Sequence, residues 1–257
     1  RRGATQQTLK PVETRFKYPA ILCAIFISCL MLLPQAYINI IACCDYAAWD
    51  SGLLPTVFTS ENFSAIFSQR SSMAPFINSG FFSFIALIAC ILWCLLAAAV
   101  VVRGKLPGKQ WTRSINLCMM LPLALPGTVI AFSLKSAFSV PTPQTLGFIL
   151  DHGVWLLPLA YCVRCLPLAY QPLLGSLESA DPSLDEAARS LGARPMRRFF
   201  SVLLPHMWPA CIAACILVYV TSLGEFVTSI MIYKPSNTPI SVYMYQLMQS
   251  GIARAAA

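Results

Sequence analysis

Few residues in this sequence could take part in chemistry, and Glu225 is the most informative of them. It lies in the segment Thr221-Ser222-Leu223-Gly224-Glu225-Phe226, toward the end of a long apolar stretch. An ionisable side chain in such a stretch is costly unless it faces protein or water, so Glu225, with Thr221 and Ser222 one turn away, is a candidate for the lining of a passage. A water-exposed structural carboxylate is the alternative, because Glu225 falls close to the expected end of the stretch. A carboxylate in a passage would suit a cationic or metal-bearing solute better than an anion.

The other chemically capable residues form no catalytic or metal-binding pattern. His152 and His206 stand alone, and the Cys162-x-x-Cys165 motif has no second half. Nearly all of the 11 cysteines lie inside apolar segments, where they serve as small apolar filler. The sequence also lacks a G-x-x-x-x-G-K phosphate-binding loop. We therefore expect no catalytic residues, no metal site and no ATP hydrolysis by this chain itself.

The composition is that of a membrane protein. Apolar residues make up 57% of the 257 residues and charged residues only 11%, whereas soluble domains carry about a quarter charged residues. The net charge of +8 could suggest nucleic-acid binding, but the basic residues flank apolar segments instead of forming one stripe. We expect a chain that crosses the lipid bilayer several times and binds no nucleic acid.

Five apolar segments are long enough to cross a membrane: residues 18–42, 76–102, 115–134, 153–170 and 206–232. The expected fold is an all-α, polytopic helical bundle. Five spans place 14 of the 18 Lys and Arg residues on one side, with Arg164 counted near the inner end of the fourth span. Because cytoplasmic loops are rich in Lys and Arg, the N-terminus is expected in the cytoplasm.

The third apolar segment is interrupted by Leu121-Pro122-Leu123-Ala124-Leu125-Pro126-Gly127. Two prolines and a glycine free several backbone carbonyls, which persist at membrane depth only where protein or a water-filled cavity satisfies them. Pro122, Pro126 and Gly127 are therefore candidate pathway-lining residues, and simple kinking of the helix is the alternative.

A polar segment at residues 181–205 lies between the last two apolar segments, and its first part predicts a short helix. Ser183 and Glu186 have the spacing of a capping box, in which each side chain accepts a hydrogen bond from the backbone N–H of the other residue. The helix would carry one apolar stripe, formed by Leu184, Ala187, Ala188 and Leu191.

The second part of this segment predicts another short helix. Gly192 is placed to end the first helix in the left-handed conformation. Pro195 suits the first turn of the second helix, and Pro205 is expected to end it. The two helices would form a helix–turn–helix at the rim of the membrane domain, shaped to fit a partner.

These residues resemble the EAA loop of ABC-importer permeases. The pattern is Glu186-Ala187-Ala188, three residues, Gly192, nine residues and then Val202-Leu203-Leu204-Pro205, with Val202 where the family has isoleucine. The resemblance implies the type I (MetI-like) permease fold, in which this loop is a coupling helix that seats in a cleft of a cytoplasmic ATPase. Coupling to the ATPase is therefore expected of Ser183, Leu184, Glu186, Ala187, Ala188, Leu191, Gly192 and Pro205.

The resemblance also implies partners. An ABC ATPase dimer would bind Mg-ATP on the cytoplasmic side, and a second permease module would complete the passage as a homodimer or a fused half. An extracytoplasmic solute-binding protein would dock on the outer loops. The chain itself would be a multi-pass protein in the lipid bilayer of a bacterial inner membrane. The stretch from Ser222 to Met248 is similar to permeases for ferric iron, thiamine, aminoethylphosphonate and polyamines, so a small solute of this kind is the expected substrate.

Residues 1–17 are expected to be a cytoplasmic lead or linker, and residues 18–257 the permease domain, with its core module at 58–257. A sixth helix is expected beyond residue 257, because permeases of this family usually have one. The basic lead without a starting Met would suit the second module of a double-length chain. Two alternatives remain open: an ion-coupled secondary transporter without an ATPase, and a scaffold that recruits a cytoplasmic partner without transport.

Overall fold

The computed structural model is built from helices, and its described residues contain no strand beyond one isolated bridge between Cys44 and Phe58. The structure describes residues 14–45, 57–68, 70–103, 108–141, 143–145, 147, 149–150 and 153–250. The chain divides into two compact units, Arg1–Ser68 with Leu247–Ala257, and Gln69–Gln246. The predicted all-α fold is confirmed.

The first unit contains α1 (Thr14–Ala42) and α2 (Glu61–Ser68). The side chains of α1 are mostly apolar and stay exposed along nearly its whole length, as expected for a helix that faces lipid. The Asn62 side chain donates hydrogen bonds to the carbonyl oxygens of Ala42 at 3.0 Å and Cys44 at 2.8 Å. These bonds satisfy groups at the end of α1 that have no partner within the helix.

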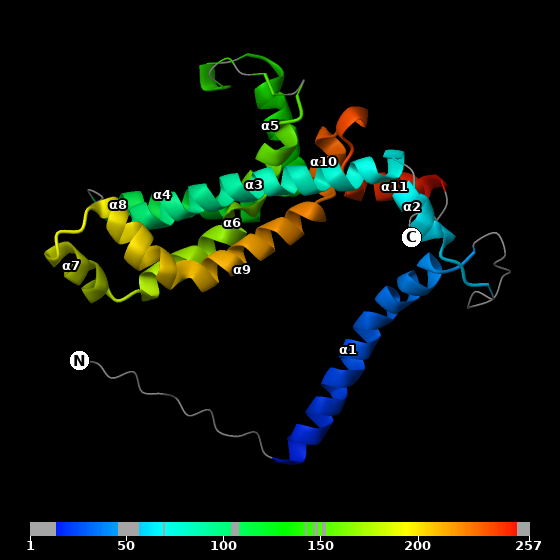
Figure 1. Cartoon of the computed structure of the whole chain (residues 1–257), viewed down its shortest axis with the longest axis horizontal. Helices are drawn as coiled ribbons and strands as arrows, with labels where there is room; N and C mark the ends of the chain where they lie inside the picture. Colours follow the sequence, from blue (N-terminus) through cyan, green and yellow to red (C-terminus); the bar gives the residue numbers. More distant parts are fainter. Residues whose placement is uncertain are drawn as a thin grey trace. The chain divides into compact units, whose positions relative to one another are not determined.

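The second unit is a bundle whose long helices are α3 (Arg70–Arg103), α6 (Leu156–Ser179) and α9 (Leu204–Leu223). They pack side by side, and α4 (Lys109–Ala124) covers α6 (Figure 1). Two shorter helices, α5 (Gly127–Ser139) and α10 (Val227–Ile232), pack on each other. The remaining elements are η1 (Pro143–Thr145), α7 (Pro182–Ser190), α8 (Pro195–Arg198), η2 (Phe199–Leu203), η3 (Pro235–Asn237) and α11 (Ile240–Ser250).

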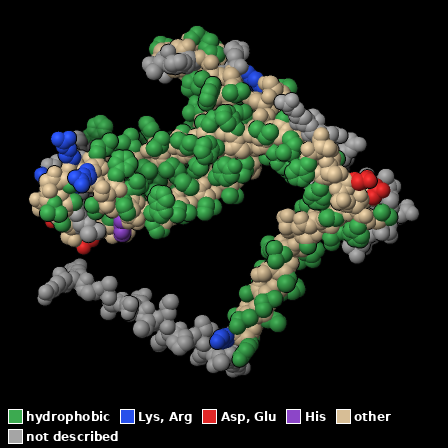
Figure 2. Space-filling model, in the orientation of Figure 1, with side chains coloured by type: hydrophobic (Ala, Val, Ile, Leu, Met, Phe, Trp, Pro, Cys, Tyr) green, Lys and Arg blue, Asp and Glu red, His purple; other side chains and the backbone are tan. Residues whose placement is uncertain are grey.

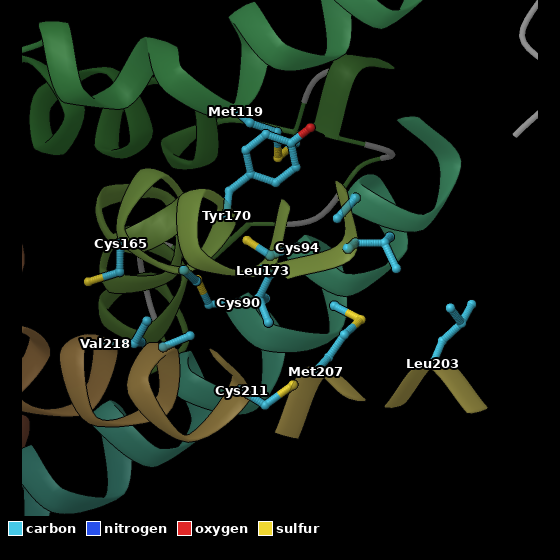
Figure 3. Packing of buried hydrophobic residues seen from close by; sticks show 14 residues of the cluster. Cys90, Cys94, Met119, Cys165, Tyr170, Leu173, Leu203, Met207, Cys211 and Val218 are labelled. Atoms are coloured by element: carbon cyan, nitrogen blue, oxygen red, sulfur yellow. The ribbon is translucent and has the colours of Figure 1, made fainter. Parts of the chain in front are cut away.

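A first apolar cluster joins α3, α4, α6 and α9. It contains fully buried Tyr170, Leu173 and Val218 together with Cys90 and Cys94, whose thiols lie among apolar neighbours (Figure 3). All 11 cysteines occur among the described residues and are free. Small side chains such as cysteine and alanine let the helices approach closely, which is how helices associate in a membrane without a hydrophobic driving force between them.

A second apolar cluster joins α3, α5, α6 and α10. Its buried members include Phe82 and Ala86 of α3, Ala131 of α5, Leu157 of α6 and Ile232 of α10. Helix α6 therefore contributes to both clusters, with its first turns in the second cluster and its later turns in the first. This helix is the central element of the unit.

Within the described residues, three helices are long and apolar enough to cross a membrane: Lys17–Ala42, Ser72–Val102 and Met196–Leu223. The bent pair α4 and α5 makes a fourth if it counts as one span, with an angle of 110° at its break. The prediction of five apolar spans is thus confirmed only in part. The predicted fourth span corresponds to α6, which is surrounded by α3, α4 and α9 and needs fewer apolar side chains than a helix facing lipid.

The predicted fifth span, residues 206–232, is wrong in one respect. It is not one helix, because α9 ends at Leu223 and α10 begins at Val227. Gly224, Glu225 and Phe226 lie outside both helices. Two of the predicted spans are therefore broken, and each break is followed by one member of the α5–α10 pair.

Candidate functional site

Helix α7 is capped at its N-terminus by Asp181, so the predicted capping box of Ser183 and Glu186 is wrong. The Asp181 carboxylate accepts a hydrogen bond from the backbone N–H of Ser183 at 2.9 Å. Pro182 occupies the first helical position, where its missing N–H costs nothing and its fixed φ favours the helix. The helix therefore starts earlier than expected, which moves Ser183 into its first turn.

Helix α7 ends at Ser190, Leu191 is its C-cap, and Gly192 follows in the left-handed conformation, as predicted. Gly192 has φ 75°, in the left-handed region. The N–H of Gly192 bonds the carbonyl of Arg189 at 2.9 Å, and the N–H of Ala193 bonds the carbonyl of Ala188 at 3.1 Å. These two bonds make a Schellman motif, which satisfies the last carbonyls of the helix.

Both ends of α7 are thus fixed. Within the described part of the chain the helix contacts α8 and η2, and part of its apolar surface stays exposed. Leu191 is 88% exposed, and Ala187 is exposed as well. Ala188 is half-buried, Glu186 is exposed, and the side chain of Leu184 lies outside the described residues. The structure therefore places a capped helix with an exposed apolar residue at the predicted coupling position.

The second predicted helix, residues 195–204, begins at Pro195 but does not end at Pro205. Helix α8 (Pro195–Arg198) continues through a π-helical turn, η2, directly into α9. Within this turn the N–H of Leu204 bonds the carbonyl of Phe199. A π turn shifts the hydrogen-bond register by one residue, and Pro205 then falls in the first turn of α9, where its missing N–H is tolerated.

The basic end of the second unit surrounds this loop. Lys and Arg side chains gather at the end that carries α7 and α8 (Figure 2). Hydrophobic side chains dominate the visible surface of the long helices of this unit. Lys109, Arg113, Arg189, Arg194 and Arg197 are exposed residues of this end. This distribution agrees with the charge asymmetry of the sequence.

The predicted break at Pro122–Gly127 is confirmed. Helix α4 ends at Ala124, Leu125 is extended, and α5 begins at Gly127. Gly127 is buried against α10, where an added Cβ would lie 3.3 Å from Thr228 Oγ1 and Val227 Cγ1. A larger residue would require these atoms of α10 to shift by a few tenths of an ångström. Pro122 is buried within α4, and Pro126 is exposed.

Arg164 of α6 connects the two breaks. Its Nη1 donates to the freed carbonyl of Leu125 at 3.4 Å, and its Nε lies 3.6 Å from Oε2 of Glu225. Arg164 is eight residues after Leu156, or roughly 12 Å along α6. The assignment of Arg164 to the inner end of a span is therefore wrong, because it lies at the level of Glu225.

Glu225 is held by residues on its own side of the break. Its Oε1 accepts hydrogen bonds from the Thr228 backbone N–H at 3.1 Å and from Thr228 Oγ1 at 2.8 Å. Its backbone carbonyl accepts from the hydroxyls of Ser229 and Ser241. The side chain is 10% exposed, against 33% for Arg164. Glu225 is thus a paired and mostly buried carboxylate, which removes the argument that it favours a cationic solute.

Further hydroxyl contacts extend this arrangement. Tyr161 and Ser229 share a hydrogen bond of 2.6 Å, and buried Ser222 lies 3.5 Å from the thiol of Cys165. Thr221 is half-buried. Tyr161 belongs to the second apolar cluster and Cys165 to the first. We call the group at this junction the polar layer; it consists of Tyr161, Arg164, Ser222, Glu225, Thr228, Ser229 and the carbonyl of Leu125.

The sequence identified only part of the polar layer. Glu225 and Ser222 were candidates, whereas Arg164 and Thr228 were not. Arg164 is a charged residue inside an apolar segment, so the argument that identified Glu225 applies to it equally. Predicting that the two side chains meet would have required the fold, because 61 positions separate them.

Comparison with known proteins defines the class. Residues 91–257 match the family model described as binding-protein-dependent transport system inner membrane component, and the chain belongs to this family. It is 29% identical over 220 residues to the probable ABC transporter permease protein y4fN of Sinorhizobium fredii, covering 85% of this chain and 38% of that protein. It is 27% identical over 167 residues to the putrescine transport system permease protein PotI of Escherichia coli K12, covering 65% of this chain and 58% of PotI. The chain therefore spans less than two thirds of either relative.

The fold is also similar to a solved structure. A chain of a bacterial ABC transporter involved in the import of the acidic polysaccharide alginate superposes with a TM-score of 0.69 at 14% identity. The match covers 96% of this chain and 93% of that chain. At this identity the likeness concerns the fold, and it agrees with the type I permease architecture expected from the sequence.

Proposed function

We propose that this chain is the permease subunit of an ATP-driven, binding-protein-dependent importer, and that α7 is its coupling helix. The observation that carries the coupling role is an α7 fixed at both ends, with Leu191 exposed beside it. Leu191 is 88% exposed in this chain and would be covered if a protein partner bound the loop. Membership of the binding-protein-dependent family supports the same proposal.

In this proposal an ABC ATPase dimer binds α7 and α8 in the cytoplasm, where the N-terminus also lies. ATP binding would close the ATPase dimer and move α7. Because α8, η2 and α9 form one continuous helical run, the movement would pass directly to α9. A second permease module and a solute-binding protein outside the membrane would complete the importer. The solute would be small, such as a polyamine, a phosphonate, thiamine or ferric iron.

The test is recovery of the ATPase. The intact operon is expressed with this permease tagged, and wild type is compared with Gly192→Asp and Glu186→Ala. We expect a co-purifying ATPase for wild type, and its loss, or hydrolysis without transport, for Gly192→Asp. Recovery of no ATPase together with transport that persists without ATP would instead support an ion-coupled secondary transporter. Uptake of labelled solutes from the four classes named above then identifies the substrate.

A further inference from the structure

We propose that the Arg164–Glu225 pair is a latch that holds the α5–α10 pair against α6 and separates when the transporter changes conformation. The inference rests on the proposed function, because a latch needs a transport cycle to release it. It assigns Arg164, which was not among the candidate residues of the sequence analysis, a positioning role in that cycle.

The first argument is the placement of the breaks. Four helical runs pack around the polar layer, and two of them are unbroken: α6, which contributes Tyr161 and Arg164 to the layer, and α3, which contributes to both apolar clusters beside it. The other two break there, between α4 and α5 and between α9 and α10. Residues at the ends of elements are those that absorb backbone rotation in hinge motions. The α5–α10 pair therefore follows two hinges at the same level.

The second argument is that α5 and α10 move most easily together. They pack on each other through Gly127, which lies against Val227 and Thr228. The Lys135 ammonium of α5 also donates to the carbonyl of Met231 in α10 at 3.5 Å. A body made of these two helices would keep such internal contacts while its contacts with α6 change.

The third argument is the geometry of the pair. Its shortest N–O distance is 3.6 Å, through one nitrogen, so it is not a tight bidentate pair. Each partner has a second contact: Glu225 keeps Thr228, which lies on the same helix start, and Arg164 contacts the Leu125 carbonyl. Separation would therefore leave the Glu225 carboxylate with two hydrogen bonds. A contact with these properties can open at moderate cost.

The fourth argument is the exposure of Arg164. Its side chain is 33% exposed although it lies roughly 12 Å inside α6. A guanidinium at that depth is expected to face water or protein, since contact with lipid tails is costly. The exposed side of Arg164 therefore faces a water-filled passage or the second permease module. Movement of α5 and α10 there would change the shape of the passage that the solute crosses.

The experiment uses the complete transporter reconstituted in proteoliposomes, with MgATP as the only added ligand. Arg164→Gln and Glu225→Gln are compared with Arg164→Glu, Glu225→Arg and the reversed pair carrying both charge reversals. Gln171→Ala is the matched control, because it also removes a side-chain contact that α6 makes with a neighbouring helix, here Met120 of α4, but away from the polar layer. The readouts are the basal ATP hydrolysis rate per intact complex and the melting temperature.

The latch predicts that Arg164→Gln and Glu225→Gln raise basal hydrolysis by about fivefold or more, the lower end of typical coupling between two sites. The reversed pair should return the rate toward wild type and melt higher than either single reversal. Gln171→Ala should leave both readouts unchanged. The effect follows because a weaker resting state makes the hydrolysing conformation easier to reach.

Other outcomes overturn the proposal. If Arg164→Gln and Glu225→Gln lower only the yield or melting temperature, with an unchanged rate per complex, the pair is a static contact. If the reversed pair is no better than the single reversals, the two side chains do not act on each other. If wild type carries no ATPase at all, the proposed function fails and the latch fails with it. If wild type hydrolyses ATP in a coupled way but the rates of the Arg164 and Glu225 variants do not change, only the latch fails.

Discussion

Replacing Gly192 by alanine should weaken binding of the ATPase through the backbone alone. Gly192 has φ 75°, and a Cβ added to it would meet no atom within 4 Å. The cost is therefore conformational: an L-residue in the left-handed region costs about 1–2 kcal/mol. That cost falls on a residue whose N–H closes one of the two Schellman bonds.

The magnitude follows from this cost. A penalty of about 1–2 kcal/mol is a factor of about 5–30 in an equilibrium constant. If the ATPase binds only the capped form of α7, its affinity should fall by at most this factor. Gly192→Asn should cost less, because asparagine adopts the left-handed conformation more readily than alanine.

The assay is titration of the purified permease in detergent with the ATPase. Gly175→Ala is the matched control: it also replaces a glycine whose Cβ would meet nothing within 4 Å, but within α6, where alanine is favoured. Equal affinities for Gly192→Ala and Gly175→Ala would refute the reasoning. Weaker binding of Gly192→Asn than of Gly192→Ala would refute it too, since the penalty would then not arise from φ.

Three further predictions follow from other contacts. The hydrogen bond from the Ser183 backbone lowers the pKa of Asp181, so the cap stabilises α7 above the usual carboxyl pKa, and this stability is lost as the pH falls through the lowered value. In acid, the amides of α7 should therefore exchange hydrogen faster in wild type than in Asp181→Asn at the same pH. Equal exchange in the two proteins would contradict the cap. Tyr170→Phe removes the 2.6 Å hydrogen bond to Asn116 Oδ1. Leaving that acceptor unsatisfied should lower the free energy of unfolding by about 1–3 kcal/mol, measured by thermal unfolding. An unchanged melting temperature would show that water replaces the phenol. Gly127→Ala would bring a Cβ 3.3 Å from two atoms of α10, and this overpacking should lower the free energy of unfolding by about 1–3 kcal/mol. Gly80→Ala is the control in the same melting assay. Its Cβ would lie 3.8 Å from the nearest atom, so the melting temperature should not change.

The sequence alone determined the membrane class, the helical fold and the position of the α7–α8 loop. These features depend on local properties: apolar length, charge placement, and the glycine and proline positions that end or break helices. Gly192 and the break at Pro122–Gly127 were predicted for this reason, since a left-handed turn and a missing N–H act on their own residues. The N-cap of α7 was nevertheless predicted at the wrong residue. Asp181 caps the helix in place of Ser183, because an aspartate before a proline is a better N-cap than the serine two positions later.

The tertiary structure decided what the broken helices do. Arg164 and Glu225 are far apart in the sequence, and no periodicity indicates that α6 passes beside both breaks. The apparent charge of Glu225 suggested a cation site, but the folded chain supplies a guanidinium and a threonine that neutralise and bind the carboxylate. Whether a buried charge is available to a solute depends on the partners that the fold brings to it, and for Glu225 the guanidinium comes from another helix, α6.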